Sequence, residues 1–369
     1  MYQSQQDGRF FFIAISFVMQ YNSKKHLRGL SMTYSIISRH RSVLMGVAAL
    51  WIYVFHMMPP GLLEAYPGWW QSVWFLRAAG FCGVDMFLFL SGFGLYYHFS
   101  RHPVNSLQDC LTFYKQRFSK IYQVFLPFTL IFAVYNNWTI RDLIRRLFAY
   151  NQLTSYVYDF CWYVVCILVF YLLVPGFMYL YRKAGKWGGA ATVAVCCGYI
   201  FGIWYFRDHL RWDLFAIYNR LPVFLLGIPA GELAKKERKI GLFGWIIGAG
   251  LLSVGAWLSF RLNSLTMDGI VPSTNALVNV LFAPGLILIL SGFFERVQRL
   301  KPAEWGMQVI AFFGTVSFEF YLMQEWYVRC YSMPVTGMQQ LMAFVLMTAF
   351  AWLLQKMSRF ISERITIKL

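Results

Sequence analysis

Long apolar runs recur along the chain and alternate with short segments rich in polar and basic residues. A membrane-spanning helix needs about 20 mainly apolar residues. The stretches that approach this length are residues 42–58, 78–97, 121–137, 160–181, 189–206, 219–234, 241–259, 271–293, 306–328 and 336–355. The pattern therefore predicts an all-α fold, a polytopic transmembrane bundle of about ten spanning helices. The stretch 219–234 is the least regular, because it contains Pro222 and Pro229.

The charges between the apolar runs indicate an orientation. If the N-terminus lies on the inner side, alternation of the loops places most of the 33 lysines and arginines on that side, as the positive-inside rule requires. An even number of helices then returns the C-terminus to the same side. We therefore expect a multi-pass protein of the cell (inner) membrane with both termini in the cytoplasm.

The composition supports a membrane protein and excludes other classes. Of the 369 residues, 59% are hydrophobic and 13% charged, whereas soluble domains carry about 25% charged residues. The net charge of +17 fits either nucleic acid or an anionic membrane surface, and the apolar content excludes a nucleic-acid partner. Disorder and a secreted disulfide scaffold are also excluded. No pair of the seven cysteines has the spacing of a zinc site, so we predict no metal site.

The chain divides into a cytoplasmic leader (1–40), a transmembrane domain (41–355) and a basic cytoplasmic tail (356–369). Within the leader, Phe10–Met19 is apolar but has about half the length needed to span a membrane. We expect this segment to lie at the membrane interface or to have no structural role. Translation from Met32 would remove it.

Basic residues also occur in Ile140–Tyr150, between the third and fourth apolar runs. Arg141 and Arg145 lie four residues apart and therefore on one face of a helix, with Arg146 beside them. Such a helix would lie on the outer membrane surface. The alternative is that it lines a site for an acidic glycan or a lipid phosphate.

Two ionisable residues within the apolar runs are candidates for chemistry, because burying one costs roughly 2.5–3.5 kcal/mol and by default indicates function. His56 ends an apolar run, and neutral imidazole is the usual proton acceptor for an alcohol. A histidine in this position is also often a hydrogen-bonded interface residue. Asp85 lies among aromatic residues and needs a partner: either His56, whose tautomer it would fix, or a backbone N–H or an arginine.

Basic and small residues provide further candidates. Arg117 and Lys120 share one helix face, which suits lipid headgroups and phosphates equally. Arg220 lies at the outer start of an apolar run, where it would orient an anionic or hydroxylated acceptor. Ser91 offers a hydroxyl, although Ser91 and Gly92 also suit close helix packing.

The late segment Ser317–Glu325 contains two further carboxylates. Glu319 shares a helix face with Met323 and Trp326. Glu325 is close enough to the outer boundary that we expect it to be solvated.

In this order, several sequence blocks resemble acyltransferase family 3, the polytopic membrane enzymes that O-acylate carbohydrates. The most specific is Gly83-Val-Asp-Met-Phe-Leu-Phe-Leu-Ser-Gly-Phe93. The others are the run Gly46–His56, the basic block Arg117–Gln123, Trp162-Tyr163 with Tyr171–Pro175, Arg220–Gly227 and Ser317–Leu322. The resemblance covers about residues 40 to 330.

The chain departs from the family pattern at four positions. The family arginine that precedes the histidine by eleven residues is Met45 here, and Arg41 lies one helical turn earlier. At 1.5 Å per residue, Arg41 would lie about 22 Å from His56, against about 16 Å for the usual spacing. Lys120 and Gln123 replace an arginine and a proline, and Gln324 stands where many relatives have histidine.

The resemblance implies transfer of an acyl group, in particular acetyl from acetyl-CoA, to a carbohydrate hydroxyl, with no bound cofactor. Arg41, Arg117 and Lys120 would hold the donor phosphates, and His56 would act as general base oriented by Asp85. Transient acylation of His56 is an alternative route. Ser91, Trp162, Arg220 and Glu319 are candidates for acceptor-binding or structural roles. Two other functions stay open: a proton-coupled transporter or flippase of a glycan, and a catalytically inactive relative.

Overall fold

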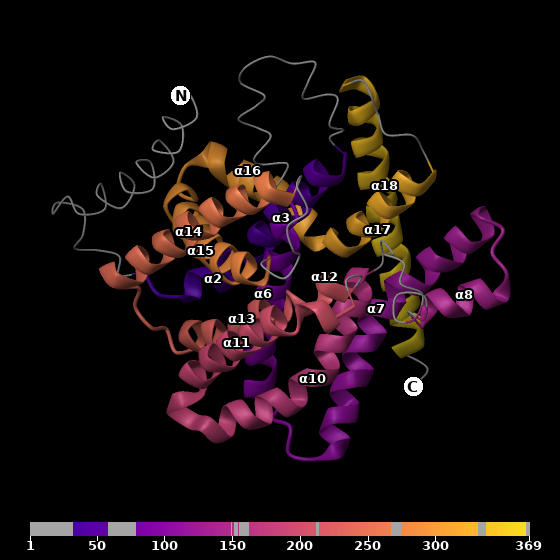
Figure 1. The fold of residues 1–369 in the computed structure, drawn as a ribbon. Coiled ribbons are helices and arrows are strands. Elements are labelled where there is room, and N and C mark those ends of the chain that lie inside the picture. The colour runs from indigo at the N-terminus through magenta and orange to yellow at the C-terminus, as the bar shows by residue number, and fades with distance from the viewer. Residues whose placement is uncertain are drawn as a thin grey trace.

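The fold was analysed in a computed structural model, which describes residues 32–57, 79–148, 150, 154, 162–211, 214–266, 275–330 and 337–366. Its elements are helices (Figure 1): α2 (Ser35–Arg39), α3 (Arg41–Met57), α6 (Cys82–Arg101), α7 (Leu107–Tyr135), α8 (Ile140–Leu147), α10 (Trp162–Ala184), α11 (Gly188–Tyr205), α12 (Phe215–Tyr218), α13 (Leu221–Lys235), α14 (Leu242–Thr266), α15 (Asn275–Val297), α16 (Lys301–Thr315), α17 (Ser317–Cys330) and α18 (Gly337–Thr366). Two short 3-10 helices, η1 (Gly185–Trp187) and η2 (Arg207–His209), complete them. The described residues contain no β-strand, which confirms the all-α prediction.

Each predicted apolar stretch contains helix in its described residues, but fewer of these helices satisfy the requirements for a span. Five helical segments are long and apolar enough to cross a membrane: Leu107–Tyr135, Trp162–Tyr205, Leu242–Ser259, Leu277–Val297 and Met338–Phe360. A sixth is added if α16 and α17 form one broken span, and Arg41–His56 is apolar but shorter. The protein is therefore a multi-pass membrane protein, and the number of about ten spans stays a prediction.

Two predicted boundaries are wrong. The stretch 306–328 is not one straight helix, because the chain bends by 69° between α16 and α17. The third helix begins at Leu107, well before the predicted residue 121. Its start is fixed by a capping box, in which the Ser106 side chain accepts from the Asp109 backbone N–H and the Asp109 carboxylate accepts from the Ser106 backbone N–H. This polar signal starts the helix before its sequence becomes apolar.

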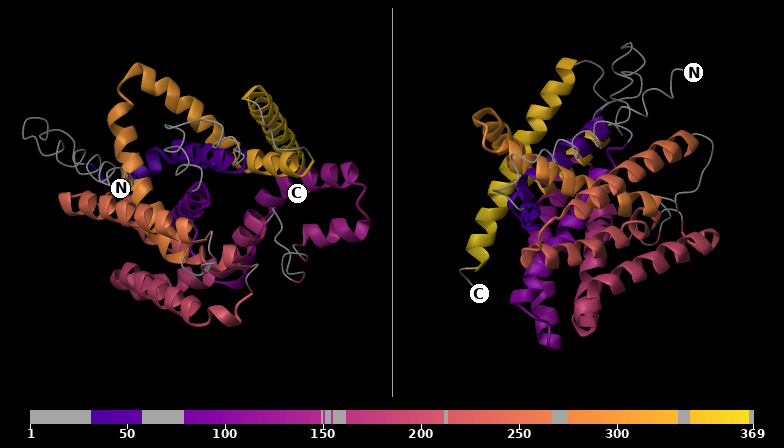
Figure 2. Two further views of the ribbon diagram at one scale, coloured as in Figure 1. Left: turned by 45° about the horizontal axis from the view of Figure 1, so that its top comes forward. Right: turned by 90° about the vertical axis from the view of Figure 1, so that its left-hand side faces the viewer.

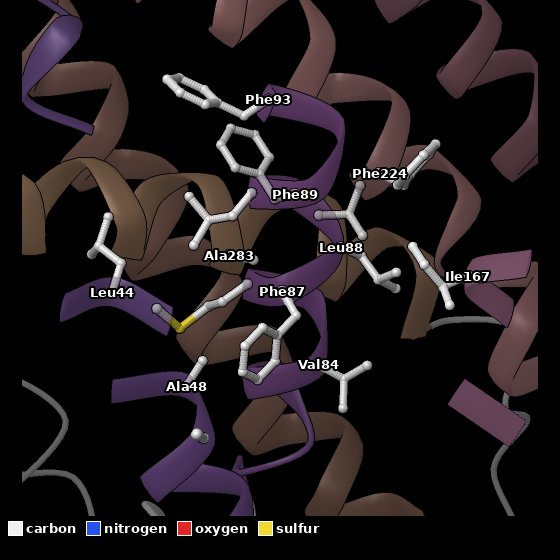
Figure 3. Close-up of a cluster of buried hydrophobic side chains, with 14 of the residues drawn as sticks. Leu44, Ala48, Val84, Phe87, Leu88, Phe89, Phe93, Ile167, Phe224 and Ala283 are labelled. Carbon is white, nitrogen blue, oxygen red and sulfur yellow. The ribbon is translucent and has the colours of Figure 1, made fainter. Parts of the chain in front are cut away.

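Helix α6 lies at the centre of the bundle, surrounded by α3, α10, α13 and α15. Figure 3 shows side chains from these five helices meeting around it, such as Leu44, Leu88, Ile167, Phe224 and Ala283. Contact with α13 is especially close. A Cβ added at Gly92 would overlap the carbonyl oxygen of Phe224, and one added at Gly227 would overlap that of Phe89. Small residues that let helix backbones touch are typical of membrane bundles, so Gly92 serves packing.

Helix ends that the alternation of loops assigns to the inner side lie together. The Tyr34 backbone N–H, at the start of α2, donates to the Arg238 carbonyl after α13, at 3.0 Å. Arg39 forms an ion pair with Glu295 near the end of α15, at 2.9 Å. These contacts bring the ends of α2, α13 and α15 together, and the side of the membrane that they face stays a prediction. Figures 1 and 2 place α7, α8 and α18 together at one side of the bundle and α11 and α14 toward the other.

The predicted division into leader, membrane domain and tail is not marked by a break in the described helices. The contacts of α2 tie residues 34–39 to the bundle, and α18 continues through the predicted tail to Thr366. The segment Phe10–Met19 lies outside the described residues.

Candidate functional site

His56 lies in the last turn of α3 and is held by a residue of α17. Its Nδ1 is 2.9 Å from Oε1 of Gln324, a side chain that is 1% exposed. A carboxamide oxygen can only accept a hydrogen bond, so Nδ1 carries the hydrogen. This tautomer places the imidazole lone pair on Nε2, which is the arrangement that a general base requires.

Asp85 forms an ion pair with Arg220 and not with His56. Oδ1 of Asp85 lies 3.1 Å from Nε of Arg220, and neither Asp85 oxygen is hydrogen-bonded to His56. The carboxylate is fully buried in the first turn of α6. The Arg220 guanidinium also lies 4.7 Å from the centre of the Trp162 ring. Of the partners that the sequence left open, the arginine is the one present, because Asp85 faces α13. The expected orientation of His56 by Asp85 is therefore wrong.

At the opposite end of α3, two arginines converge on one tyrosine. Arg41 and Arg117 both interact electrostatically with Tyr171 of α10 and with each other. The Arg117 guanidinium lies 5.9 Å from the centre of the Tyr171 ring, and Tyr171 is hydrogen-bonded to Ser91. We call Arg41, Arg117, Tyr171 and Ser91 the arginine cluster. Ser91 thus belongs to the expected donor-binding end of the molecule.

The positive charge of the arginine cluster has no negative counterpart within the described part of the chain. Neither Arg41 nor Arg117 forms an ion pair with a described carboxylate, and the Nε of each is buried without a hydrogen-bond partner there. Arg41 has one long contact, from Nη2 to the Leu90 carbonyl at 3.4 Å. Both arginines are partly buried, and charges withdrawn from water normally pair with anions. This arrangement is suited to an anionic ligand such as phosphate.

The predicted third member of the donor site, Lys120, is exposed one turn beyond Arg117. It lies close enough to His98 to interact with it electrostatically. His98 follows the predicted span 78–97. Its burial, with the neighbouring Arg117, His102 and Lys120, lowers the pKa of His98 to about 4. His98 is therefore neutral at pH 7 and adds no charge to the cluster.

Helix α8 is anchored to α17 by a buried ion pair. Arg146 binds Glu325, whose side chain is fully buried. The Arg146 guanidinium also lies over the ring of Trp138, at 5.1 Å. The expectation that Glu325 is solvated is wrong, because α8 folds over this end of α17. The other basic side chains of α8 include Arg141, which is exposed.

Glu319 does not join His56. It is buried and interacts with Arg359 of α18, so its partner lies on the neighbouring helix. Met323 and Trp326 line an apolar cavity of about 220 Å³ between α7, α17 and α18.

The sequence pattern does not mark Gln324 or Tyr171 as a site residue. Tyr171 lies in a block that resembles a family motif, and Gln324 lies two residues beyond the block Ser317–Leu322, at a position where the chain departs from the family pattern. The position of Gln324, a polar side chain between the apolar Met323 and the carboxylate of Glu325, was the only other indication. The contacts with His56 and Arg117 join helices far apart in sequence.

Comparisons with known proteins agree with the sequence motifs. A family model, Acyl_transf_3, described as an acyltransferase domain, matches residues 41–356. No curated protein and no solved structure gave a match. In the described ranges, no group of three or more His, Cys, Asp or Glu residues is arranged to hold a metal ion. The matched region includes His56, Asp85 and the arginine cluster, and the chain therefore belongs to this family of membrane acyltransferases.

Proposed function

We propose that this protein transfers an acetyl group from acetyl-CoA to a hydroxyl of a cell-surface or lipid-linked carbohydrate. The observation that carries the proposal is the pairing of two features at opposite ends of α3. One is the arginine cluster, where two partly buried arginines with buried Nε atoms lack a carboxylate partner within the described residues. The other is His56 with its Nδ1 hydrogen bonded to Gln324.

The distance between these ends suits the shape of the proposed donor. Arg41 and His56 are separated by about 22 Å along α3. The pantetheine arm of coenzyme A is an extended amide chain whose bond lengths give it a reach on the order of 20 Å. With its phosphates at the arginine cluster, the donor presents its thioester near His56. This supports a cytoplasmic donor and an acceptor arriving from the other side, given the predicted orientation of the termini.

The chemistry follows from the tautomer of His56. Nε2 takes the proton of the acceptor hydroxyl, the oxygen attacks the thioester carbonyl, and the carbon–sulfur bond breaks. The thiolate leaves with the proton that His56 had accepted. No charged carboxylate is needed beside the imidazole, because Gln324 already fixes its orientation. Asp85 and Arg220 support the helices around this region.

The test is the variant His56→Ala in purified protein reconstituted into lipid nanodiscs. We expect loss of acetyl transfer, measured as thiol release from acetyl-CoA in the presence of acceptor glycans. The transferred group is identified by mass spectrometry of surface glycans from cells with and without the gene. Binding of acetyl-CoA to the variant provides the folding control, because the arginine cluster is distant from His56. Acetyl transfer at the unaltered rate by His56→Ala would refute the proposal for the base.

A further inference from the structure

Gln324 has a second polar group that its contact with His56 does not use. The side-chain Nε2 is buried and has no hydrogen-bond partner among the described residues. A buried polar group left without a partner costs about 1–3 kcal/mol. A neutral apolar residue such as methionine would fill similar space without this cost.

The geometry of the carboxamide group places its unpaired nitrogen beside the imidazole of His56. Gln324 Oε1 is 2.9 Å from His56 Nδ1, and the two heteroatoms of one carboxamide are about 2.3 Å apart. Nε2 of Gln324 is therefore no more than about 5 Å from Nδ1 of His56. A substrate oxygen close to the imidazole is within hydrogen-bond reach of this N–H.

We propose that Gln324 has two roles in acyl transfer: its oxygen positions His56, and its amide N–H donates to the carbonyl oxygen of the thioester. This inference rests on the proposed function. As the acceptor oxygen bonds to the carbonyl carbon, the carbonyl oxygen gains negative charge, and a donor already in place stabilises it. When the carbon–sulfur bond breaks, the carbonyl re-forms and the proton passes from His56 to the thiolate.

Chemically graded variants of Gln324 separate the two roles. Gln324→Met removes both the acceptor and the donor. Gln324→Glu keeps the acceptor for Nδ1–H, adds a charge and lacks the amide donor at neutral pH. Gln324→His provides one donor and one acceptor on a neutral ring.

The experiment measures kcat and KM for each variant across a range of pH in nanodiscs, together with the dissociation constant of acetyl-CoA. Removal of an oxyanion donor typically lowers kcat by about 10²–10³-fold. We expect a loss of this size in Gln324→Glu and a larger one in Gln324→Met. We expect partial recovery in Gln324→His and an unchanged affinity for acetyl-CoA in all three. The acidic limb of the rate profile of Gln324→Glu should move to higher pH, because a carboxylate favours the protonated imidazole.

Two results would overturn the inference. One is a kcat of Gln324→Met within about threefold of the unaltered protein. The other is equal loss of kcat and of acetyl-CoA binding in all three variants, which would indicate a purely structural role. His56→Ala distinguishes this failure from failure of the proposed function: if His56 is essential while Gln324→Met is fully active, only the role of Gln324 is wrong.

Discussion

Two groups of charged residues, one near each end of α3, differ in whether their charges are paired within the protein. At the His56 end, two buried carboxylates have cationic partners: Asp85 is paired with Arg220 and Glu325 with Arg146. At the other end, the buried Nε atoms of Arg41 and Arg117 have no hydrogen-bond partner in the part of the chain that the structure describes.

This difference separates residues that hold the bundle together from residues suited to a ligand. A buried ion pair joins two helices, and removing one member leaves the other charge buried and unpaired. A partly buried cation without an internal counterion can instead form an ion pair with an incoming anion, and this pairing stabilises the bound anion. The two kinds of site therefore predict opposite consequences when a charge is removed.

The largest expected effect is a loss of folding stability in Asp85→Ala. The substitution leaves Arg220 buried beneath Trp162 without its carboxylate, and losses of about 3–5 kcal/mol are typical of a broken buried pair. The measurement is thermal unfolding of the detergent-solubilised protein, with acetyl-CoA absent. The double variant Asp85→Leu with Arg220→Met removes both charges and should recover much of the stability. Full stability combined with loss of acetyl transfer in Asp85→Ala would instead assign the carboxylate to the chemistry.

Arg117→Gln should have an intermediate effect, which falls on the binding of acetyl-CoA and not on folding stability. Hydrogen bonds to charged groups contribute about 1.5–3 kcal/mol, so the dissociation constant of acetyl-CoA should rise about 10–100-fold. The stability of the unliganded protein should not fall, because an unpaired cation is removed. Isothermal titration calorimetry and thermal unfolding of the same preparation check both statements. Unaltered affinity would show that the arginine cluster does not hold the donor.

The motifs predicted the membrane bundle and most of the candidate site, because both depend on patterns local to one segment. Apolar length identifies helices such as α10, and an ionisable residue in an apolar run identifies His56 and Asp85. The sequence also placed Arg41 and His56 at opposite ends of one helix. These predictions need no knowledge of which helices are neighbours.

The predicted contacts of Asp85 and Glu325 were wrong because they depend on which helices pack against each other. Asp85 faces α13 because Gly92 and Gly227 bring α6 and α13 into backbone contact, and neither glycine reveals which helix it meets. Glu325 was expected in solvent because its position near a helix end says nothing of α8, which covers it. The bend between α16 and α17 likewise lies within a stretch whose hydropathy resembles one span.

The smallest expected effect on acetyl-CoA affinity is that of His98→Gln. This variant tests whether a residue beside Arg117 contributes to the donor site when it carries no charge. His98 lies beside Arg117, but its pKa of about 4 keeps it neutral at pH 7. Replacing it with a neutral amide should therefore change the affinity for acetyl-CoA less than twofold at pH 7, against the large loss in Arg117→Gln.

The same variant should also change the stability of the protein in acid. Since the pKa of His98 in the folded protein lies below the ordinary value of about 6.5, protonation of His98 opposes folding as the pH falls from about 6.5 toward 4. His98→Gln should accordingly be less sensitive to acid in thermal unfolding at pH 4.5 than the unaltered protein. A tenfold loss of affinity at pH 7 would mean that the imidazole contacts the donor directly, and that the donor site extends along α6 from Ser91 to His98.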